Sequence, residues 1–235
     1  MCLIDMKNKG LEYFENPRYD IQELIPNDSG RVLDVGCGTG LFGKILKENG
    51  AKEVVGIEIN KEAAKIAKNR LDRVIIGDIE EINLPFNKEY FDYMVYADIL
   101  EHLIDPWSVL KEHYKFLNKD GQIIVSIPNI RHVFIFKNLF LGDWPYTNRG
   151  ILDKTHLRFF TLKTGNKLIE SRNYKIRSIK KIYRLWENPK SQNKILQGIN
   201  FIFSKIIPHF PLLRDFFVFQ YIFIGDKNES SPNIP

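Results

Sequence analysis

The sequence predicts an α/β protein built on a doubly wound, mostly parallel sheet with helices on both faces. Apolar runs alternate along the chain with helical segments, at the spacing expected of strand–helix–strand units. The apolar runs are nearly uninterrupted, which is typical of strands that are covered on both faces. A glycine-rich turn, Gly36–Gly40, joins the first run to the first helix, at the edge where sheets of this class bind ligands.

Seven strands and four helices are expected, in a Rossmann-like order. The strands are placed at Arg31–Val35, Glu53–Ile57, Arg73–Gly77, Phe91–Tyr96, Gln122–Ile127, Tyr174–Tyr183 and Phe216–Ile224. The helices are placed at Leu41–Asn49, Lys61–Leu71, Pro106–Leu117 and Lys163–Ser171. Asn60 is expected to cap the second helix, and Asp105, followed by Pro106, the third.

The regular alternation breaks twice after the fifth strand. Residues 128–160 are long, aromatic and irregular, and residues 186–214 form a second variable stretch. Long irregular segments in compact domains tend to be lids or binding loops, so both are expected to be insertions on the substrate side, with the first covering the site. The length favours a single domain, residues 1–226, followed by a polar tail, residues 227–235, that we expect to be flexible.

Composition limits the class of protein. Hydrophobic residues make up 44% of the chain, enough for a sizeable core, yet no apolar stretch is long enough to span a membrane. Charged residues near the start do not fit a secretory signal. Two cysteines, Cys2 and Cys37, are too few for a disulfide framework, so a reducing, cytoplasmic location is expected. The net charge is +5, but lysines alternate with acids, so nucleic acid is not expected as a partner.

The segment Val32–Gly40 carries the strongest functional signal. Gly36, Gly38 and Gly40 permit a tight turn, and the helix that follows presents unpaired N–H groups. Their G-x-G-x-G spacing differs from the G-x-G-x-x-G of dinucleotide loops, and the Gly-Lys-Ser/Thr of a phosphate-binding loop does not follow. Asp34 would repel a pyrophosphate but could hold an ammonium group.

The run VLDVGCGTG resembles motif I of class I S-adenosylmethionine-dependent methyltransferases. The resemblance implies S-adenosylmethionine as the cofactor. Glu58, at the end of the second strand, would accept hydrogen bonds from the ribose hydroxyls. Asp78, at the end of the third, would accept from the adenine amino group. The full set of expected cofactor-binding residues is Asp34, Gly36, Cys37, Gly38, Gly40, Glu58, Ile59, Asp78, Ile79 and Ala97.

Further segments resemble a bacterial subgroup of these enzymes linked to cell-surface glycan synthesis. They are residues 127–132 and 142–161, within a resemblance that extends over residues 11–175. It implies O-methylation of a small-molecule or glycan hydroxyl. Asn16-Pro17-Arg18 also resembles related enzymes, and Arg18 either pairs with the cofactor carboxylate or is a surface arginine.

Methyl transfer to a hydroxyl needs alignment of the reactants and a base. His156, with Asp153 three residues earlier to orient it, is the first candidate, and His102 and His132 are alternatives. A second interpretation makes Asp153, His156 and Arg158 a structural latch before a helix capped by Thr161. Both interpretations stay open at this point.

A metal site is a further alternative. If residues 98–102 are helical, Asp98, Glu101 and His102 share one face, and a similar segment is proposed as a metal site in some quinone-biosynthesis O-methyltransferases. Many relatives carry Glu-His here with no known metal role. We therefore expect no metal ion, and a packed, hydrogen-bonded His102 instead.

Other functions remain to be separated. An RNA or protein methyltransferase would fit the positive charge, although no nucleic-acid module or basic stripe is present. A non-catalytic S-adenosylmethionine-binding protein would keep the same cofactor residues. The segment Lys194–Tyr221, rich in Ile and Phe, would pack in the core or an interface, cover the pocket, or touch a membrane peripherally. The sequence does not indicate an oligomeric state.

Overall fold

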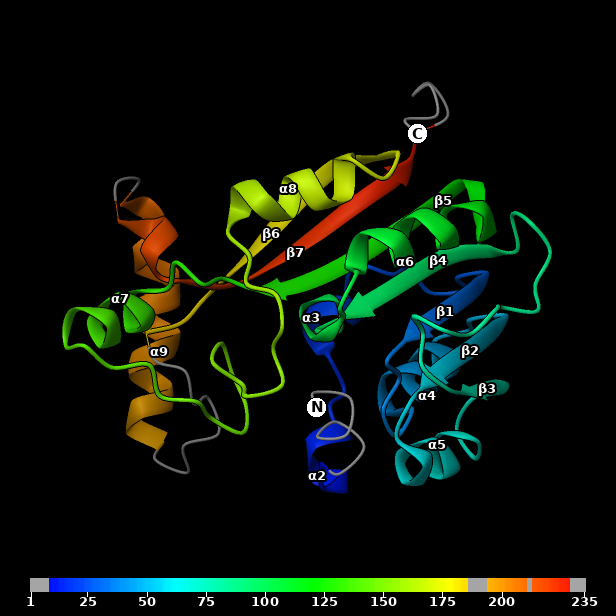
Figure 1. Ribbon diagram of the computed structural model, residues 1–235, viewed down its shortest axis with the longest axis horizontal. Helices are drawn as coiled ribbons and strands as arrows, with labels where there is room; N and C mark the ends of the chain where they lie inside the picture. Colours follow the sequence, from blue (N-terminus) through cyan, green and yellow to red (C-terminus); the bar gives the residue numbers. More distant parts are fainter. Residues whose placement is uncertain (1–8, 186–193, 211–212, 229–235) are drawn as a thin grey trace.

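The computed structural model describes residues 9–185, 194–210 and 213–228, and its centre is a seven-stranded sheet of order β3-β2-β1-β4-β5-β7-β6 (Figure 1). The strands are β1 Arg31–Val35, β2 Glu53–Glu58, β3 Arg73–Ile76, β4 Phe91–Ala97, β5 Leu117–Pro128, β6 Tyr174–Tyr183 and β7 Val218–Lys227. The first five pair in parallel, and β7 runs antiparallel to both β5 and β6. The predicted doubly wound, mostly parallel sheet is confirmed.

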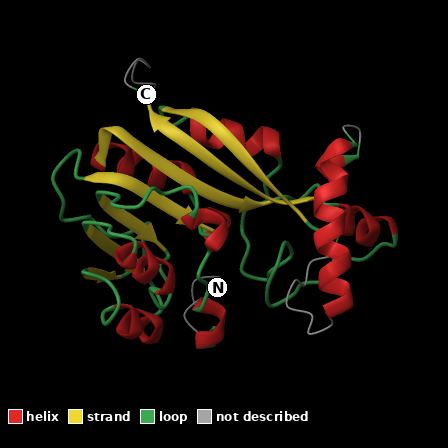
Figure 2. Cartoon of the chain, turned by 180° about the vertical axis from the view of Figure 1, so that it is seen from behind, coloured by secondary structure: helices red, strands yellow, loops and turns green. Residues whose placement is uncertain are grey.

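Helices precede, connect and follow the strands (Figure 2). The α-helices are α2 Leu11–Phe14, α3 Tyr19–Gln22, α4 Leu41–Glu48, α5 Lys61–Ala67, α6 Pro106–His113, α7 Val133–Phe140, α8 Leu162–Glu170 and α9 Lys194–Ile206. Short 3₁₀ turns are η1 Leu100–His102, η2 Tyr114–Phe116, η3 Ile207–His209 and η4 Arg214–Phe216. Asn60, Asp105 and Thr161 cap α5, α6 and α8 as predicted.

The sheet has a hydrophobic core on each face because successive strand residues point to opposite sides. On β1, Val32 packs with α3, α4 and α5, through residues such as Ile21 and Phe42. Leu33, the next residue, belongs to the other core, with Leu110 of α6 and side chains of α8. Helices therefore cover both faces, as the sequence predicts.

Several element boundaries differ from the prediction; the helix expected at Lys61–Leu71, for example, ends at Ala67. The helix expected at Pro106–Leu117 ends at His113, and Leu117 already pairs with Phe91 as the start of β5. The last strand begins at Val218 instead of Phe216 and continues to Lys227, so the expected tail begins later than residue 227. Pairing with neighbouring strands sets these strand ends, and the local sequence pattern does not predict such pairing. Residues 229–235 lie outside the described residues.

Both predicted insertions contain helices. Residues 128–160, expected to be irregular, include α7, whose first N–H groups are capped by the side chain of His132. Ile135 of α7 packs against Ile151, Leu152 and Phe219, and this tertiary contact stabilises a helix whose β-branched and aromatic residues are weak helix formers. The second stretch includes α9, and its residues 186–193 and 211–212 lie outside the described residues. None of the described helices is long and apolar enough to cross a membrane.

Candidate active site

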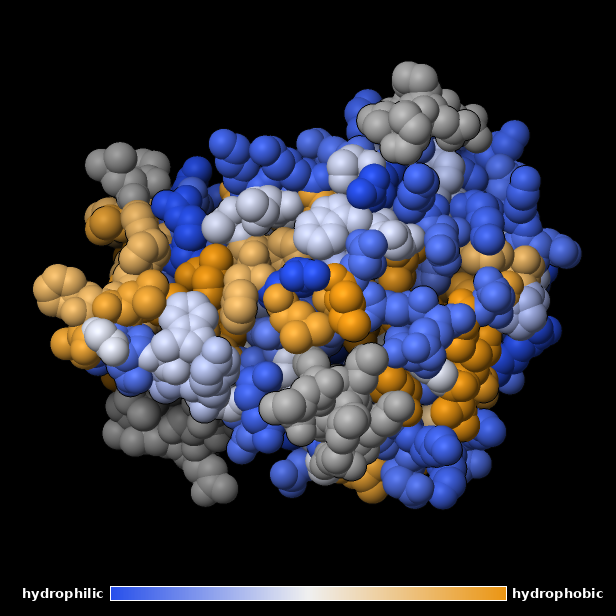
Figure 3. All heavy atoms as spheres, viewed as in Figure 1, coloured by the Kyte–Doolittle hydropathy of each residue, from blue (hydrophilic) through white to orange (hydrophobic). Residues whose placement is uncertain are grey.

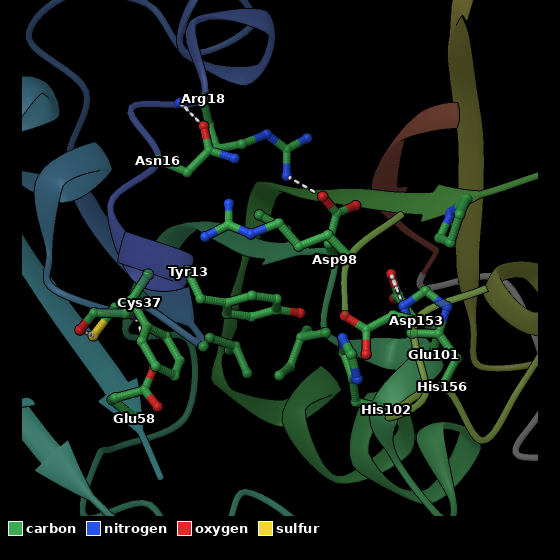
Figure 4. Close-up of a pocket in the computed structure, with 18 of the residues that line it drawn as sticks. Tyr13, Asn16, Arg18, Cys37, Glu58, Asp98, Glu101, His102, Asp153 and His156 are labelled. Atoms are coloured by element: carbon green, nitrogen blue, oxygen red, sulfur yellow. Dashed lines mark hydrogen bonds and ion pairs between the residues drawn. The ribbon is translucent and has the colours of Figure 1, made fainter. Parts of the chain in front are cut away.

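A cavity of about 630 Å³ lies at the carboxyl ends of β1, β2 and β4, where the glycine loop meets the first insertion. Figure 4 shows Cys37 and Glu58 on one side of it, Glu101, His102 and His156 on the other, and Tyr13 between them. The volume is in the range of small-molecule sites. Every predicted cofactor-binding residue except Gly40 lines this cavity, as do all three predicted catalytic residues.

The glycine loop is held against β2 by its own backbone. The N–H groups of Gly36 and Cys37 both donate to the carbonyl oxygen of Ile57, at 2.9 and 3.0 Å. At Gly38 the backbone is left-handed, and a Cβ atom there would come within 2.8 Å of the Phe14 carbonyl oxygen. Residues other than glycine are strained in this conformation, so the turn requires glycine. The loop thus has a fixed shape before any ligand arrives.

Asp34 is the charged group at the floor of the glycine loop. It is 2% exposed, and its Oδ2 atom has no hydrogen-bond partner among the described residues. Burial, and then the nearby Glu58 carboxylate, raise the pKa of Asp34 to about 7, although Arg18 opposes the shift. A buried carboxylate oxygen without a partner is costly unless a cation reaches it. Asp34 therefore fits the predicted contact with an ammonium group.

Glu58 is engaged by the protein itself. Its two carboxylate oxygens accept from the backbone N–H groups of Gly38, at 2.8 Å, and Asn60, at 2.7 Å. Burial raises the pKa of Glu58, and the backbone hydrogen bonds from Asn60, Gly38 and Ile59 oppose that effect. The residue lines the cavity at the end of β2, so the predicted contact with a ribose stays a prediction that this position permits.

The other predicted cofactor residues divide into two groups. Ile59, Asp78, Ile79 and Ala97 line the cavity at the ends of β2, β3 and β4. Gly40 faces away from it: its φ is 75°, and a Cβ atom would lie 3.1 Å from Ala67 Cα in α5. Close packing of α4 against α5 therefore explains why position 40 is glycine. A direct contact between Gly40 and the cofactor stays a prediction.

His156 lies at the opposite end of the cavity, with one ring nitrogen already engaged. Its Nδ1 atom is 2.9 Å from the carbonyl oxygen of Ile151. A carbonyl only accepts, so the neutral ring carries its proton on Nδ1 and leaves Nε2 able to accept another. Burial lowers the pKa of His156 and favours this neutral form. The predicted orienting role of Asp153 is wrong, because Ile151 holds the ring.

Glu101 stands beside His156, and it is the acid/base candidate that the sequence prediction missed. Its Oε1 atom is 3.9 Å from His156 Nε2, and its buried Oε2 atom has no partner among the described residues. Burial, and then the charge of Asp98, raise the pKa of Glu101 well above its usual range. Both shifts favour the neutral forms of the pair, a carboxylic acid next to an unprotonated imidazole.

His102 is packed and hydrogen-bonded, as expected. Its Nδ1 atom lies 3.1 Å from the carbonyl oxygen and 3.0 Å from the hydroxyl of Thr155, and its ring meets that of His156 edge to face, with centroids 4.7 Å apart. Burial, with the neighbouring His156, lowers the pKa of His102 to about 3. The other alternative base, His132, caps α7 and does not line the cavity.

Residues 98–102 are not one helix, so Asp98, Glu101 and His102 do not share the helical face on which the metal alternative depended. Residue 98 has a left-handed backbone, with φ of 55°, and only Leu100–His102 form a 3₁₀ turn. Asp98 instead accepts from Arg18, at 2.9 Å, and from Ser126. Ligand atoms of Glu101, His102 and His156 do lie within 4.8 Å of one another, a spacing that could hold a metal ion. The expectation of no metal ion stays a prediction.

Arg18 is buried, so its interpretation as a surface arginine is wrong. The side chain is 8% exposed and lines the cavity. Its guanidinium donates to Asp20, Asp98 and the Ser126 hydroxyl, which ties the segment before β1 to the ends of β4 and β5. Pairing of Arg18 with a cofactor carboxylate stays a prediction.

The N-terminal segment closes the cavity against the first insertion. Lys9 Nζ lies 2.7 Å from Asp153 Oδ2 and 2.6 Å from the Asn148 carbonyl oxygen, and 4.3 Å from the ring centre of Tyr13. Tyr13 lines the cavity, and burial, followed by the charge of Asp153, raises the pKa of its hydroxyl. Local sequence gives no signal for Lys9 or Tyr13, because their partners are more than a hundred residues away.

Comparisons with known proteins agree with this geometry. Residues 12–179 match the family described as "Methyltransferase domain". The chain is 36% identical over 140 residues to an uncharacterized protein of Methanocaldococcus jannaschii, which is 59% of this chain and 52% of that protein. It is 32% identical over 108 residues to the ubiquinone biosynthesis O-methyltransferase of Haemophilus ducreyi, which is 42% of this chain and 45% of that enzyme. The chain thus spans about half the length of these relatives.

A solved structure shares the fold. The SAM-dependent methyltransferase of Archaeoglobus fulgidus superposes with a TM-score of 0.61, at 22% identity, over 93% of this chain and 95% of that one. At this identity the likeness concerns the fold alone. The family match confirms the predicted methyltransferase class, and the solved structure confirms its fold.

Proposed function

This chain belongs to the methyltransferase-domain family of S-adenosylmethionine-dependent enzymes, and we propose that it methylates a hydroxyl oxygen of a small-molecule or glycan acceptor. The observation that carries the proposal is the neutral imidazole of His156, whose Nε2 atom is free to accept a proton at the end of the cavity opposite the glycine loop. A hydroxyl must lose its proton as it attacks, whereas a thioether or a neutral amine can attack without a base.

The glycine-loop end has the groups that S-adenosylmethionine requires. Asp34 offers the buried, unpartnered Oδ2 atom to the ammonium group of the cofactor, and Glu58 and Asp78 line the places predicted for the ribose and adenine. The cofactor supplies an electrophilic methyl group on its sulfonium. The residues of the chain hold the reactants in line and keep water out, which accounts for much of the acceleration of such a displacement.

The other end has the groups that a hydroxyl acceptor requires. His156 Nε2 takes the hydroxyl proton, and the Ile151 carbonyl keeps the ring in the correct tautomer. The Oε1 atom of Glu101, 3.9 Å from Nε2, places a partial negative charge beside the imidazolium that forms and so stabilises it. Glu101 acts through His156 in this scheme, so it is a positioning residue.

The walls of the cavity favour a small acceptor or the end of a chain. Tyr13 lines the cavity, and Lys9, packed on its ring, contacts Asn148 and Asp153 of the insertion, which also line it. The match to an enzyme named for ubiquinone biosynthesis O-methylation supports oxygen as the methylated atom. The glycan alternative rests on the resemblance of residues 127–132 and 142–161.

Calorimetry with S-adenosylmethionine and its demethylated product tests the cofactor end. We expect the wild type to bind both, and Asp34→Ala, Glu58→Ala and Asp78→Ala to bind more weakly. A methyl-transfer assay with labelled cofactor then screens alcohols, phenols, sugars and lipid-linked sugars. A methyl ether product supports the proposal. Binding of the cofactor with transfer only to amines, protein or RNA would overturn the assignment of a hydroxyl acceptor. If the wild type binds no cofactor, the chain has the fold of a methyltransferase without the activity.

A further inference from the structure

The second region of interest is an apolar surface on α7 and α9, at the end of the molecule away from β3. Its defining residues are Leu139, Phe140, Leu141, Phe201, Ile202 and Ile206, which we call the α7–α9 surface; all are more than half exposed, and Phe140 is 91% exposed. Figure 3 shows apolar side chains gathered over these helices. Large apolar side chains clustered on a surface mark a site of interaction.

The two helices form one surface because neighbouring aromatic residues hold them. Phe216 packs edge to face against Phe136 of α7, with ring centres 5.5 Å apart. Phe217, the next residue, packs edge to face against Phe203 of α9, with ring centres 4.9 Å apart. The buried side of α9 is thereby fixed to the domain. Its exposed side carries Ile202 and Ile206, one turn apart on the same face.

Charge distinguishes this surface from the rest of the chain. Residues 129–142 and 194–214 contain no Asp or Glu, although the chain has 29 of these residues in all. The same two stretches contain Arg131, Lys137, Lys194, Lys205 and Arg214. Lys137 and Lys205 are exposed beside the apolar residues. The nearest acids along the chain are Asp143, exposed two residues after Leu141, and Asp215, which is paired with Lys181 at 2.7 Å.

We propose that the α7–α9 surface docks on an anionic lipid bilayer, with its Phe, Leu and Ile side chains inserted at the interface and its lysines against acidic headgroups. Exposed aromatic and aliphatic side chains bordered by more Lys and Arg than acids are what an interfacial segment on an anionic membrane requires. A symmetric dimer through this surface would place the same cations of two copies opposite one another, which disfavours a second copy as the occupant.

The surface is connected to the cavity wall. His132, the cap of α7, packs edge to face on Phe219, with ring centres 5.8 Å apart, and its Nε2 atom is 2.9 Å from the Arg184 carbonyl oxygen. Phe219 and Arg184 both line the cavity. If the proposed function holds, docking would bring an acceptor that lives in the membrane to the enzyme. The docking itself does not depend on the identity of the acceptor.

Cosedimentation of the wild-type protein with vesicles tests the docking without cofactor or acceptor. We expect binding to vesicles of mixed phosphatidylcholine and phosphatidylglycerol, weaker binding at high salt, and little binding to phosphatidylcholine alone. Phe140→Ser combined with Phe201→Ser should weaken binding by at least about tenfold, because both rings lose their burial in the bilayer. The matched control is Tyr19→Ser with Ile104→Ser, at exposed positions outside the surface, and it should bind as the wild type does.

Two double Lys→Glu variants distinguish the effect of charge on the α7–α9 surface from the effect of the net charge of the protein. Lys137→Glu with Lys205→Glu should reduce binding at least about tenfold, from roughly 1 kcal/mol for each cation near the membrane. Lys163→Glu with Lys167→Glu changes the net charge equally on exposed positions of α8, and should bind nearly as well as the wild type. Unchanged cofactor affinity in every variant shows that each is folded. No wild-type binding, equal loss in the two charge variants, or a dimer abolished by Phe140→Ser with Phe201→Ser would overturn the proposal.

Discussion

The two ends of the cavity each contain a buried carboxyl group with one unpartnered oxygen, Asp34 Oδ2 at the glycine loop and Glu101 Oε2 beside His156. Burial raises the pKa of both. They differ in what surrounds them. Asp34 Oδ2 has no hydrogen-bond partner among the described residues and lies below the glycine loop, whereas Glu101 stands beside a neutral histidine that can receive a proton.

The comparison shows that burial alone does not define a role for an acid. At Asp34 the missing partner is a cation that the ligand brings, so the carboxylate form matters for binding. At Glu101 the neighbour is the base His156, so the protonation state of this pair matters for turnover. Asp34→Asn and Glu101→Gln each keep the shape of the side chain and remove its titration. The first should therefore affect cofactor binding, and the second should affect turnover.

The largest effect is expected at the His156 end. His156→Asn should lower kcat by about 10²- to 10⁴-fold, the usual contribution of a general base, and leave the cofactor Kd unchanged. Glu101→Gln should lower kcat less and also leave that Kd unchanged. Initial rates and calorimetry measure the two quantities.

The control for this prediction is His132→Asn. His132 caps α7 outside the cavity, and asparagine is also a capping residue, so activity should stay near that of the wild type. If His156→Asn keeps full activity with a hydroxyl acceptor, His156 is not the base, and the structural-latch interpretation is favoured.

The next largest effect is expected for Asp34→Asn. Cofactor affinity should fall by at least about 30-fold, because removing one member of a buried charge pair costs about 2 kcal/mol or more. The thermal midpoint of the ligand-free protein at pH 8 should rise. The raised pKa means that the folded state binds the Asp34 proton more tightly than the unfolded state, so folding stability falls as the pH rises from the usual pKa of 3.8 to about 7 and stays reduced at pH 8; asparagine avoids this loss. Equal cofactor affinity in wild type and variant would contradict the ammonium role.

A pH dependence of cofactor binding follows from the same residue. Below about pH 7 Asp34 is protonated and attracts the ammonium group less. Affinity should therefore rise about tenfold from pH 6 to pH 8 in the wild type. The slope should be absent in Asp34→Asn, which is the matched control for titration of any other group.

A smaller effect is expected where the N-terminal segment meets the insertion. Lys9→Met should lower the free energy of unfolding by about 1–3 kcal/mol, because Asp153 loses a buried hydrogen-bonded cation. Burial disfavours ionised Asp153, but bonds from Lys9 and Thr155 outweigh burial and lower its pKa. That stabilisation is present at neutral pH and is lost on acidification through the lowered pKa, so the difference between wild type and variant should shrink in acid.

Lys44→Met is the control for Lys9→Met. Lys44 pairs with Glu48 on the exposed side of α4, and such a pair contributes less than about 1 kcal/mol. Urea unfolding at two pH values measures both variants. A loss for Lys9→Met no larger than for Lys44→Met would show that the closing contact is not stabilising.

The smallest effect is expected from metal removal. We expect a chelator to leave the methyl-transfer rate unchanged, because proton transfer to His156 requires no cation. A rate that falls on chelation and returns with a divalent ion would instead assign Glu101, His102 and His156 as ligands, in agreement with their 4.8 Å spacing.

Local patterns in the sequence were sufficient for the cofactor half of the molecule. Val32 and Leu33 alternate between two cores, a glycine turn follows, and acids stand at the ends of consecutive parallel strands. Each of these signals lies within a few residues of the group that it positions. The class of enzyme and its cofactor could therefore be predicted before any contact was known.

The acceptor half was decided by tertiary structure. Glu101 is fixed by backbone bonds from Leu157 and Arg158, and Lys9 reaches Asp153 across 144 residues. α7 forms because Ile135 packs on distant side chains, against its local propensity. The sequence by itself determined the strands, the glycine turn and the acids that predict a cofactor site, because that information is local. Only the fold decided which acids and bases face this site, because burial and pairing between distant segments set their protonation.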